Sequence, residues 1–263
     1  MGGPQAQIDL AVYHHRPRVE IGSGARVVFV HGTLDRAAAF LKVVRRLPDL
    51  EVVRYDRRGY ARSREAGEAS DLDSLVADLL LVLDGTPAVL VGHSLGGVIA
   101  LALAARRPDL VRAVAAFEAP MPWMPWWPRP AVGDDPLAVA GPEAASVAAE
   151  RFMRRIVGDD RWERLPPATQ QQRRAEGPAL LADLRSVRDG PACDPAAIVC
   201  PVVVGYGTAT AERHRRAAQT LAAAIPGAEL IRIAGAGHDA HTTHPDGFAA
   251  FVRRAVERAE LGH

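Results

Sequence analysis

The sequence has few cysteines, few aromatic residues and almost no lysine. Two cysteines among 263 residues cannot form a disulfide framework, and a chain of this length buries enough surface to fold without one. So few cysteines fit a reducing compartment, and each of the two is interpreted as a free thiol. Lys42 is the only lysine, so arginine provides nearly all of the positive charge.

Strong net charge and long apolar segments are also missing. The 32 basic residues oppose 31 acidic ones and are scattered along the chain, which argues against nucleic acid as a partner. The longest apolar runs, such as Val27 to Val30 and Ala113 to Phe117, are far shorter than the ~20 residues of a membrane span. Residues 1–7 lack the charged and apolar regions of a secretory signal. We therefore expect a soluble, cytoplasmic protein that does not bind membranes.

Short β-branched segments alternate with alanine- and leucine-rich ones over residues 26–119. The apolar runs are continuous, which is typical of parallel strands covered on both faces. They predict strands at 26–30, 51–55, 88–91 and 111–117. Helices are predicted at 37–46, 71–83 and 95–107. This order predicts right-handed crossovers in a doubly wound α/β sheet.

The same alternation returns near the end of the chain, after a segment of different texture. It predicts strands at 201–204 and 229–233 and helices at 211–225 and 245–260. Between the two parts, residues 121–196 begin with prolines and tryptophans and continue as polar helical segments at 143–157 and 178–187. We interpret 121–196 as a helical cap inserted into a core formed by 1–120 and 197–263. Residues 8–15 alternate and predict an antiparallel edge strand, with a turn at 22–24.

One glycine-rich motif carries the strongest chemical signal. Gly92-His93-Ser94-Leu95-Gly96 follows a predicted buried strand and precedes a predicted helix. In this context G-x-S-x-G predicts a sharp strand-to-helix turn that holds the serine hydroxyl outward, with glycines where side chains would collide. The N-terminus of the helix favours negative charge developing at Ser94. A phosphate-binding loop is the alternative, but the chain has neither G-x-G-x-x-G nor a Walker lysine.

This motif resembles the nucleophile turn of the α/β-hydrolase superfamily, and the resemblance covers nearly all of the chain outside the predicted cap. The segment 31–33 is similar to the one that follows the first buried strand in that superfamily, and 55–60 resembles its D-x-R-G-x-G turn. Gly237-His238, after the last predicted strand, is similar to its catalytic histidine loop. The resemblance implies an α/β-hydrolase fold, a mostly parallel doubly wound sheet with an inserted helical cap, and serine hydrolase activity.

The resemblance also implies roles for individual residues. Ser94 would be the nucleophile and His238 its general base. The backbone N–H groups of Leu95 and Thr33 would form the oxyanion hole. The third member of the triad departs from the usual pattern, because the loop 205–210 holds no carboxylate.

The acid of the triad is therefore predicted at another strand end. Glu118 directly follows a predicted strand, and some branches of the superfamily carry the acid there. Glu212, at the start of the next helix, is the alternative, although it lies about a turn too far along the chain. Asp35, Asp56 and Asp239 are interpreted as turn or loop-capping residues.

A metal site is the competing interpretation of the histidines. His238, His241 and His244 are spaced so that they could cluster, but no carboxylate-rich segment accompanies them, and the serine already provides a nucleophile. We therefore expect neither a metal nor another cofactor. His241 and His244 are interpreted as surface or helix-start residues, and His31 as a packing residue.

Trp123, Trp126 and Trp127 open the predicted cap, and prolines among them prevent a regular helix. They either anchor the cap to the core or bind the substrate, and in the second case they favour an apolar acyl or alcohol group. We predict that the chain acts on a small-molecule substrate, and that it hydrolyses a carboxylic ester or related acyl compound through an acyl-enzyme intermediate. A thioester, lactone, amide or carbon–carbon bond is open on the same triad, and so is a binding protein without catalysis.

Overall fold

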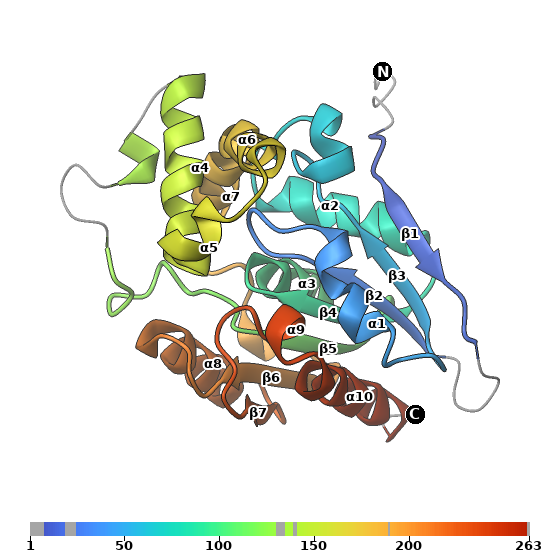
Figure 1. The fold of residues 1–263 in the computed structure, drawn as a ribbon. Coiled ribbons are helices and arrows are strands. Elements are labelled where there is room, and N and C mark those ends of the chain that lie inside the picture. The colour runs from blue at the N-terminus through green and yellow to red at the C-terminus, as the bar shows by residue number, and fades with distance from the viewer. Residues whose placement is uncertain (1–7, 19–24, 130–134, 139–140, 189, 262–263) are drawn as a thin grey trace, which may run out of the picture.

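The computed structural model describes residues 8–18, 25–129, 135–138, 141–188 and 190–261. These residues form a seven-stranded sheet in the order β1-β3-β2-β4-β5-β6-β7, with helices on both faces (Figure 1). The strands are β1 (Val12–His15), β2 (Arg26–Val30), β3 (Glu51–Tyr55), β4 (Ala88–His93), β5 (Val111–Phe117), β6 (Val202–Gly207) and β7 (Glu229–Ile233). Strand β1 pairs antiparallel with β3 and the remaining pairs are parallel. The predicted doubly wound sheet with its antiparallel edge is confirmed, whereas the turn predicted at 22–24 lies outside the described residues.

Helices connect the strands and cover both faces of the sheet. The helices next to the sheet are α1 (Leu41–Val44), α2 (Leu72–Leu83), α3 (Leu95–Arg106), α8 (Glu212–Ala224), α9 (Ala240–Thr243) and α10 (Pro245–Leu261). Short 3-10 turns are η1 (Ala37–Phe40), η2 (Ala61–Ala66), η3 (Pro136–Ala138) and η4 (Pro195–Ala197). The regular helix predicted at 37–46 is wrong: η1 leads into the single turn α1. Pro48 explains the early end, because it cannot extend a helix and disfavours helical backbone in the residue before it.

Alternate side chains of the central strands pack on opposite faces of the sheet. Val28 and Leu90 belong to the apolar cluster that includes α2, α3 and α8. Val27 and Val91 belong to the cluster that includes α1 and α10. Both faces of these strands are therefore buried, which is why their sequences are apolar without alternation.

Four further helices lie between β5 and β6 in the chain. They are α4 (Pro142–Val157), α5 (Asp159–Glu163), α6 (Pro167–Ala175) and α7 (Gly177–Ser186). In Figure 1 they lie together as a separate layer beside the sheet domain. Trp162 and Leu180 are fully buried in a third apolar cluster, which also includes Leu34 and Tyr60 from the sheet domain. This cluster attaches the α4–α7 layer next to the loop that follows β2.

Cys193 and Cys200 are free and half-buried. Within the described ranges, every helix is too short or too polar to cross a bilayer.

Candidate active site

Ser94 lies at a sharp turn between β4 and α3, in a strained backbone conformation with φ 53° and ψ −124°. The turn is possible because glycines surround it. A Cβ at Gly92 would lie 2.3 Å from the carbonyl oxygen of Gly96, and a Cβ at Gly96 would lie 2.0 Å from that of Val30. The Ser94 N–H donates to the carbonyl oxygen of Phe117 at 2.8 Å, which ties the turn to the end of β5.

Glu118 follows β5 and is fully buried, and its carboxylate contacts the His238 imidazole. The distance from Glu118 Oε2 to His238 Nδ1 is 2.6 Å. Glu118 Oε1 accepts the Gly207 N–H at 2.9 Å, and Oε2 also accepts the Thr210 hydroxyl at 2.9 Å. With Nδ1–H donated to the carboxylate, Nε2 of His238 is the nitrogen that can accept a proton.

The alternative acid, Glu212, lies elsewhere. It is exposed at the start of α8, where its carboxylate pairs with Arg215. The structure therefore brings Glu118, and not Glu212, to His238. The loop 205–210, which lacks an acid of its own, instead donates two hydrogen bonds to Glu118.

A second imidazole, that of His214, packs against His238. The His214 ring stacks on the His238 ring with centroids 4.4 Å apart, and the Trp127 ring meets His214 edge-on at 5.6 Å. Burial lowers the pKa of His214 to about 2, with the neighbouring His238 acting in the same direction. His214 therefore stays neutral and acts as an apolar, aromatic support; its sequence position gave no sign of this contact.

Ser94 and His238 both line a cavity of about 270 Å³ between the sheet domain and the α4–α7 layer. Most of its wall is apolar and is contributed by Leu34, Phe152, Met153, Ile156, Val157 and Leu165. Its polar lining includes Thr33, Arg36, Arg161 and Arg173.

The three tryptophans proposed for substrate binding, Trp123, Trp126 and Trp127, do not line this cavity. They pack on the apolar cluster around α2, α3 and α8, so in this structure they anchor the chain after β5.

The loop that carries Thr33 is fixed by a buried ion pair. The Thr33 hydroxyl donates to Asp183 Oδ2 on α7 at 2.9 Å, and Arg57 pairs with the same carboxylate at 2.6 Å. Arg57 also donates to the carbonyl oxygens of His31 and Gly32, at 2.9 and 3.2 Å. A Cβ at Gly32 would lie 2.9 Å from Ser94 Cβ, so this loop packs directly against the serine. Leu95, the other predicted oxyanion donor, begins α3.

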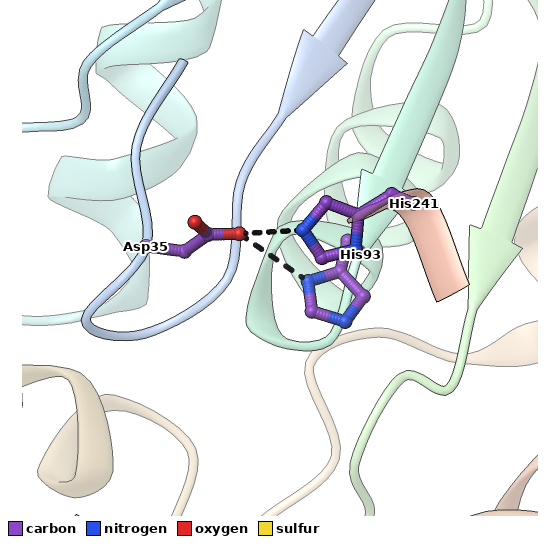
Figure 2. A group of neighbouring side chains, drawn as sticks. All are labelled: Asp35, His93 and His241. Atoms are coloured by element: carbon purple, nitrogen blue, oxygen red, sulfur yellow. Dashed lines mark hydrogen bonds and ion pairs between the residues drawn. The ribbon is translucent and has the colours of Figure 1, made fainter. Parts of the chain in front are cut away.

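Asp35, His93 and His241 form a second polar cluster on the cavity wall (Figure 2). Of the two interpretations of His241, the helix-start one is confirmed, because His241 is the second residue of α9. The surface one is wrong, because its side chain is buried and its Nε2 lies 3.0 Å from Asp35 Oδ2. Asp35 is not merely a turn residue either. Burial alone would raise the pKa of its carboxyl, but the His241 hydrogen bond and the surrounding imidazoles lower it below the ordinary value. Burial also lowers the pKa of His93 far below its usual range, and the His241 and His238 rings act in the same direction.

The cluster of His238, His241 and His244, which their spacing allows but which we did not expect, does not form. Within the described residues, His241 groups with Asp35 and His93, whereas His238 groups with Glu118 and His214; His244 belongs to neither group. No local pattern predicts either group, because the three members of each come from distant segments of the chain.

Comparison with known proteins agrees with this architecture. The profile of the alpha/beta hydrolase family matches residues 27–251. The pimeloyl-[acyl-carrier protein] methyl ester esterase of Chromobacterium violaceum is 31% identical over 258 residues, covering 91% of this chain and 96% of the esterase.

Two other curated relatives match over shorter segments. Lipase LipV of Mycobacterium tuberculosis is 34% identical over 114 residues, 42% of each chain. The 2-(acetamidomethylene)succinate hydrolase of Mesorhizobium japonicum is 40% identical over 103 residues, 38% of this chain and 37% of the hydrolase. These two matches thus span only about two fifths of either relative.

Among solved structures, the enol-lactonase of Burkholderia xenovorans superposes with a TM-score of 0.71 at 23% identity, covering 94% of this chain and 96% of the lactonase. At this identity the likeness concerns the fold alone. Together with the match of the family profile over most of the sheet domain and the α4–α7 layer, it supports one assignment: the chain belongs to the alpha/beta hydrolase family.

Proposed function

We propose that this protein is a serine hydrolase that cleaves a small carboxylic ester through an acyl-enzyme intermediate. The observation that carries the proposal is the 2.6 Å contact between the buried Glu118 and His238, which lines the same cavity as Ser94. A buried carboxylate that fixes an imidazole, in one cavity with a serine on a strained turn, supports serine hydrolysis.

In the proposed mechanism, His238 Nε2 removes the hydroxyl proton of Ser94 as Oγ attacks the ester carbonyl. Glu118 stabilises the imidazolium that forms, and it remains ionised throughout. The backbone N–H groups of Leu95 and Thr33 donate to the oxyanion of the tetrahedral intermediate. The imidazolium then protonates the leaving alcohol. Water, deprotonated by His238, releases the acid by the same route.

The cavity supports a substrate with one small apolar group. A volume of about 270 Å³, mostly walled by aliphatic and aromatic side chains, suits a short acyl or alcohol chain better than a long one. We propose that residues 121–196 act as the cap of this cavity, because Phe152, Met153 and Leu165 from its helices form much of the wall.

The relative from Chromobacterium violaceum, named as a methyl ester esterase, supports an ester as the bond cleaved. The two free cysteines support a reducing, cytoplasmic location.

A fluorophosphonate probe tests the nucleophile directly. The wild-type protein should be labelled covalently, and Ser94→Ala should abolish both labelling and turnover of p-nitrophenyl esters. Thr210→Ser, which keeps the hydroxyl that supports Glu118, serves as the control and should still label. Labelling that persists in Ser94→Ala would overturn the assignment, and ester binding without labelling or turnover in the wild type would favour a non-catalytic binding protein.

A further inference from the structure

We propose that Asp35, His93 and His241 form a binding site for a divalent transition-metal ion, of which Zn²⁺ fits the ligands best. Figure 2 shows both imidazoles directed at one carboxylate oxygen of Asp35. Asp35 Oδ2 and one ring nitrogen from each histidine all lie within 4.8 Å of one another. The proposal does not depend on the serine chemistry proposed above.

The hydrogen bonding of His93 is the first argument. Its Nε2 lies 2.8 Å from the backbone carbonyl oxygen of His238, an atom that can only accept, so Nε2 carries the proton. The other nitrogen, Nδ1, therefore presents a lone pair. His93 is only 5% exposed, and Nδ1 has no hydrogen-bond partner among the described residues. It faces Asp35 Oδ2 at 3.8 Å, which is a second acceptor.

A buried acceptor, His93 Nδ1, thus faces a half-buried one, Asp35 Oδ2, which leaves the lone pair of Nδ1 unsatisfied, and this is unfavourable. A cation bound between His93 Nδ1 and Asp35 Oδ2 would accept a lone pair from each of them. Zn²⁺ bonds of about 2.0–2.2 Å in tetrahedral geometry separate neighbouring ligand atoms by roughly 3.3–3.5 Å. The distances from Asp35 Oδ2 to His93 Nδ1 and to His241 Nε2, 3.8 and 3.0 Å, lie on either side of this value. Small side-chain rotations therefore suffice to bind the ion.

Metal binding requires His241 to present a lone pair at Nε2, which in the structure faces Asp35. Its Nδ1 is buried without a hydrogen-bond partner among the described residues, so the neutral ring can carry its proton there instead. The hydrogen bond to Asp35 is then replaced by two bonds to the ion. The ring stays in place because it packs against Phe40 and Phe248, with centroids 5.0 and 5.9 Å away.

The surroundings also fit a metal site. Histidine ligands commonly donate their second ring N–H to a backbone carbonyl, as His93 does to His238. Two imidazoles and one carboxylate favour Zn²⁺ or a similar transition metal over Mg²⁺ or Ca²⁺, which prefer oxygen ligands. All three side chains line the cavity beside Ser94, so the fourth coordination position faces the cavity, where water or an anionic oxygen of a ligand can occupy it.

The second cluster, Glu118 with His214 and His238, is a weaker choice. Both carboxylate oxygens of Glu118 already accept hydrogen bonds from Gly207, Thr210 and His238. The ion is therefore assigned to the Asp35 cluster, and an experiment has to separate the two.

Calorimetric titration of the chelator-treated full-length protein with ZnCl₂ tests the site without reference to activity. The wild type should bind one equivalent with a Kd tighter than ~10 μM. Bound Co²⁺ should give the visible absorption bands of tetrahedral coordination. Asp35→Asn and His241→Gln should each weaken Zn²⁺ binding by ~100-fold or more, since even outer-shell partners of a metal contribute ~10–100-fold.

Two variants serve as matched controls, with circular dichroism to check that every variant is folded. His244→Gln removes an imidazole three positions from His241, and His214→Phe removes one from the second cluster; both should bind Zn²⁺ as the wild type does. A wild type that binds no ion would overturn the proposal. So would a loss of binding in His214→Phe or His244→Gln equal to that in His241→Gln. If Asp35→Asn does not fold, His241→Gln and the wild-type titration still decide the question.

Discussion

Glu118 and His238 are 120 residues apart in the chain, and their side chains meet with Oε2 and Nδ1 2.6 Å apart. The carboxylate cannot swing away from the ring, because Gly207 and Thr210 hold its two oxygens. His214 stacks on one face of the ring and limits its tilt. The orientation of His238 is thus fixed by neighbours on three different segments before any substrate arrives.

Replacing the carboxylate by an amide tests this relationship. Glu118→Gln should lower kcat for p-nitrophenyl acetate by ~10³–10⁴-fold, because the imidazole loses the partner that fixes its tautomer and stabilises its charged form. KM should change little, since Glu118 is fully buried behind the histidine. The exposed Glu212→Gln is the matched control and should retain the wild-type kcat. The assignment of the acid fails if the two variants behave in the opposite way.

The turn at Ser94 predicts an unusual response to alanine. In a helix, Gly96→Ala ordinarily stabilises by ~1 kcal/mol. Here it should destabilise by ~3 kcal/mol or more, because the new Cβ would lie 2.0 Å from the carbonyl oxygen of Val30 and β2 would have to move. Urea unfolding measures the change. Gly190→Ala, where an added Cβ meets no described atom within 4 Å, should unfold as the wild type does. A stabilised Gly96→Ala protein would contradict the described turn.

The buried carboxylate of Asp183 should be important for stability. Asp183→Ala leaves Arg57 with a buried, uncompensated charge, and it removes the acceptor of the Thr33 and Tyr60 hydroxyls. We expect a loss of ~3–5 kcal/mol in the free energy of unfolding, as for other broken buried ion pairs. Asp73→Ala breaks an ion pair on the exposed surface of α2 and should have a much smaller effect. Equal losses in the two variants would show that burial of the Asp183 pair does not matter.

The buried neutral histidines predict that the fold weakens in mild acid. Burial lowers the pKa of His31 to about 3 and that of His214 to about 2. As the pH falls below the unfolded value of ~6.5, the unfolded chain gains protons at these positions and the folded chain does not. Stability is therefore complete above that pH and declines toward the folded pKa values, with a combined loss of roughly 4 kcal/mol at pH 5.

Urea midpoints measured between pH 7.5 and pH 5 test this expectation. His214→Phe keeps an aromatic ring between Trp127 and His238 but cannot be protonated. It should reduce the pH dependence of the unfolding free energy by about one proton's contribution, ~1.4 kcal/mol per pH unit. An unchanged slope in this variant would show that His214 is not neutral in the folded protein.

The fold could be predicted from the sequence because both faces of the parallel sheet are buried. The resulting continuous apolar runs, such as Val27 to Val30, are a local property of the chain. The position of Glu118 could also be predicted, because a carboxylate directly after a buried strand lies at the edge of the sheet where such folds bind their ligands. The missing acid at 205–210 has its explanation only in the structure, where this loop donates hydrogen bonds to Glu118.

Other parts of the site could not be predicted, because they depend on packing between distant segments. His241 follows a loop whose polarity suggests the surface, and it becomes buried only when Phe40, Phe248 and Asp35 pack around it. The three tryptophans have a composition suited to either a ligand or an anchor. The surface against which they pack decides between these roles, and no local pattern in the sequence predicts that surface.

The ionic ties between the α4–α7 layer and the sheet domain limit how this enzyme can be re-engineered. Arg57 and Arg36 belong to the sheet domain, whereas their partners Asp183 and Glu176 belong to the inserted helices. An exchange of the insertion for a foreign one without matching acids would cover these two guanidinium groups again but leave them without their carboxylate partners. A replacement insertion would therefore need carboxylates at the positions of Asp183 and Glu176, buried to the same extent.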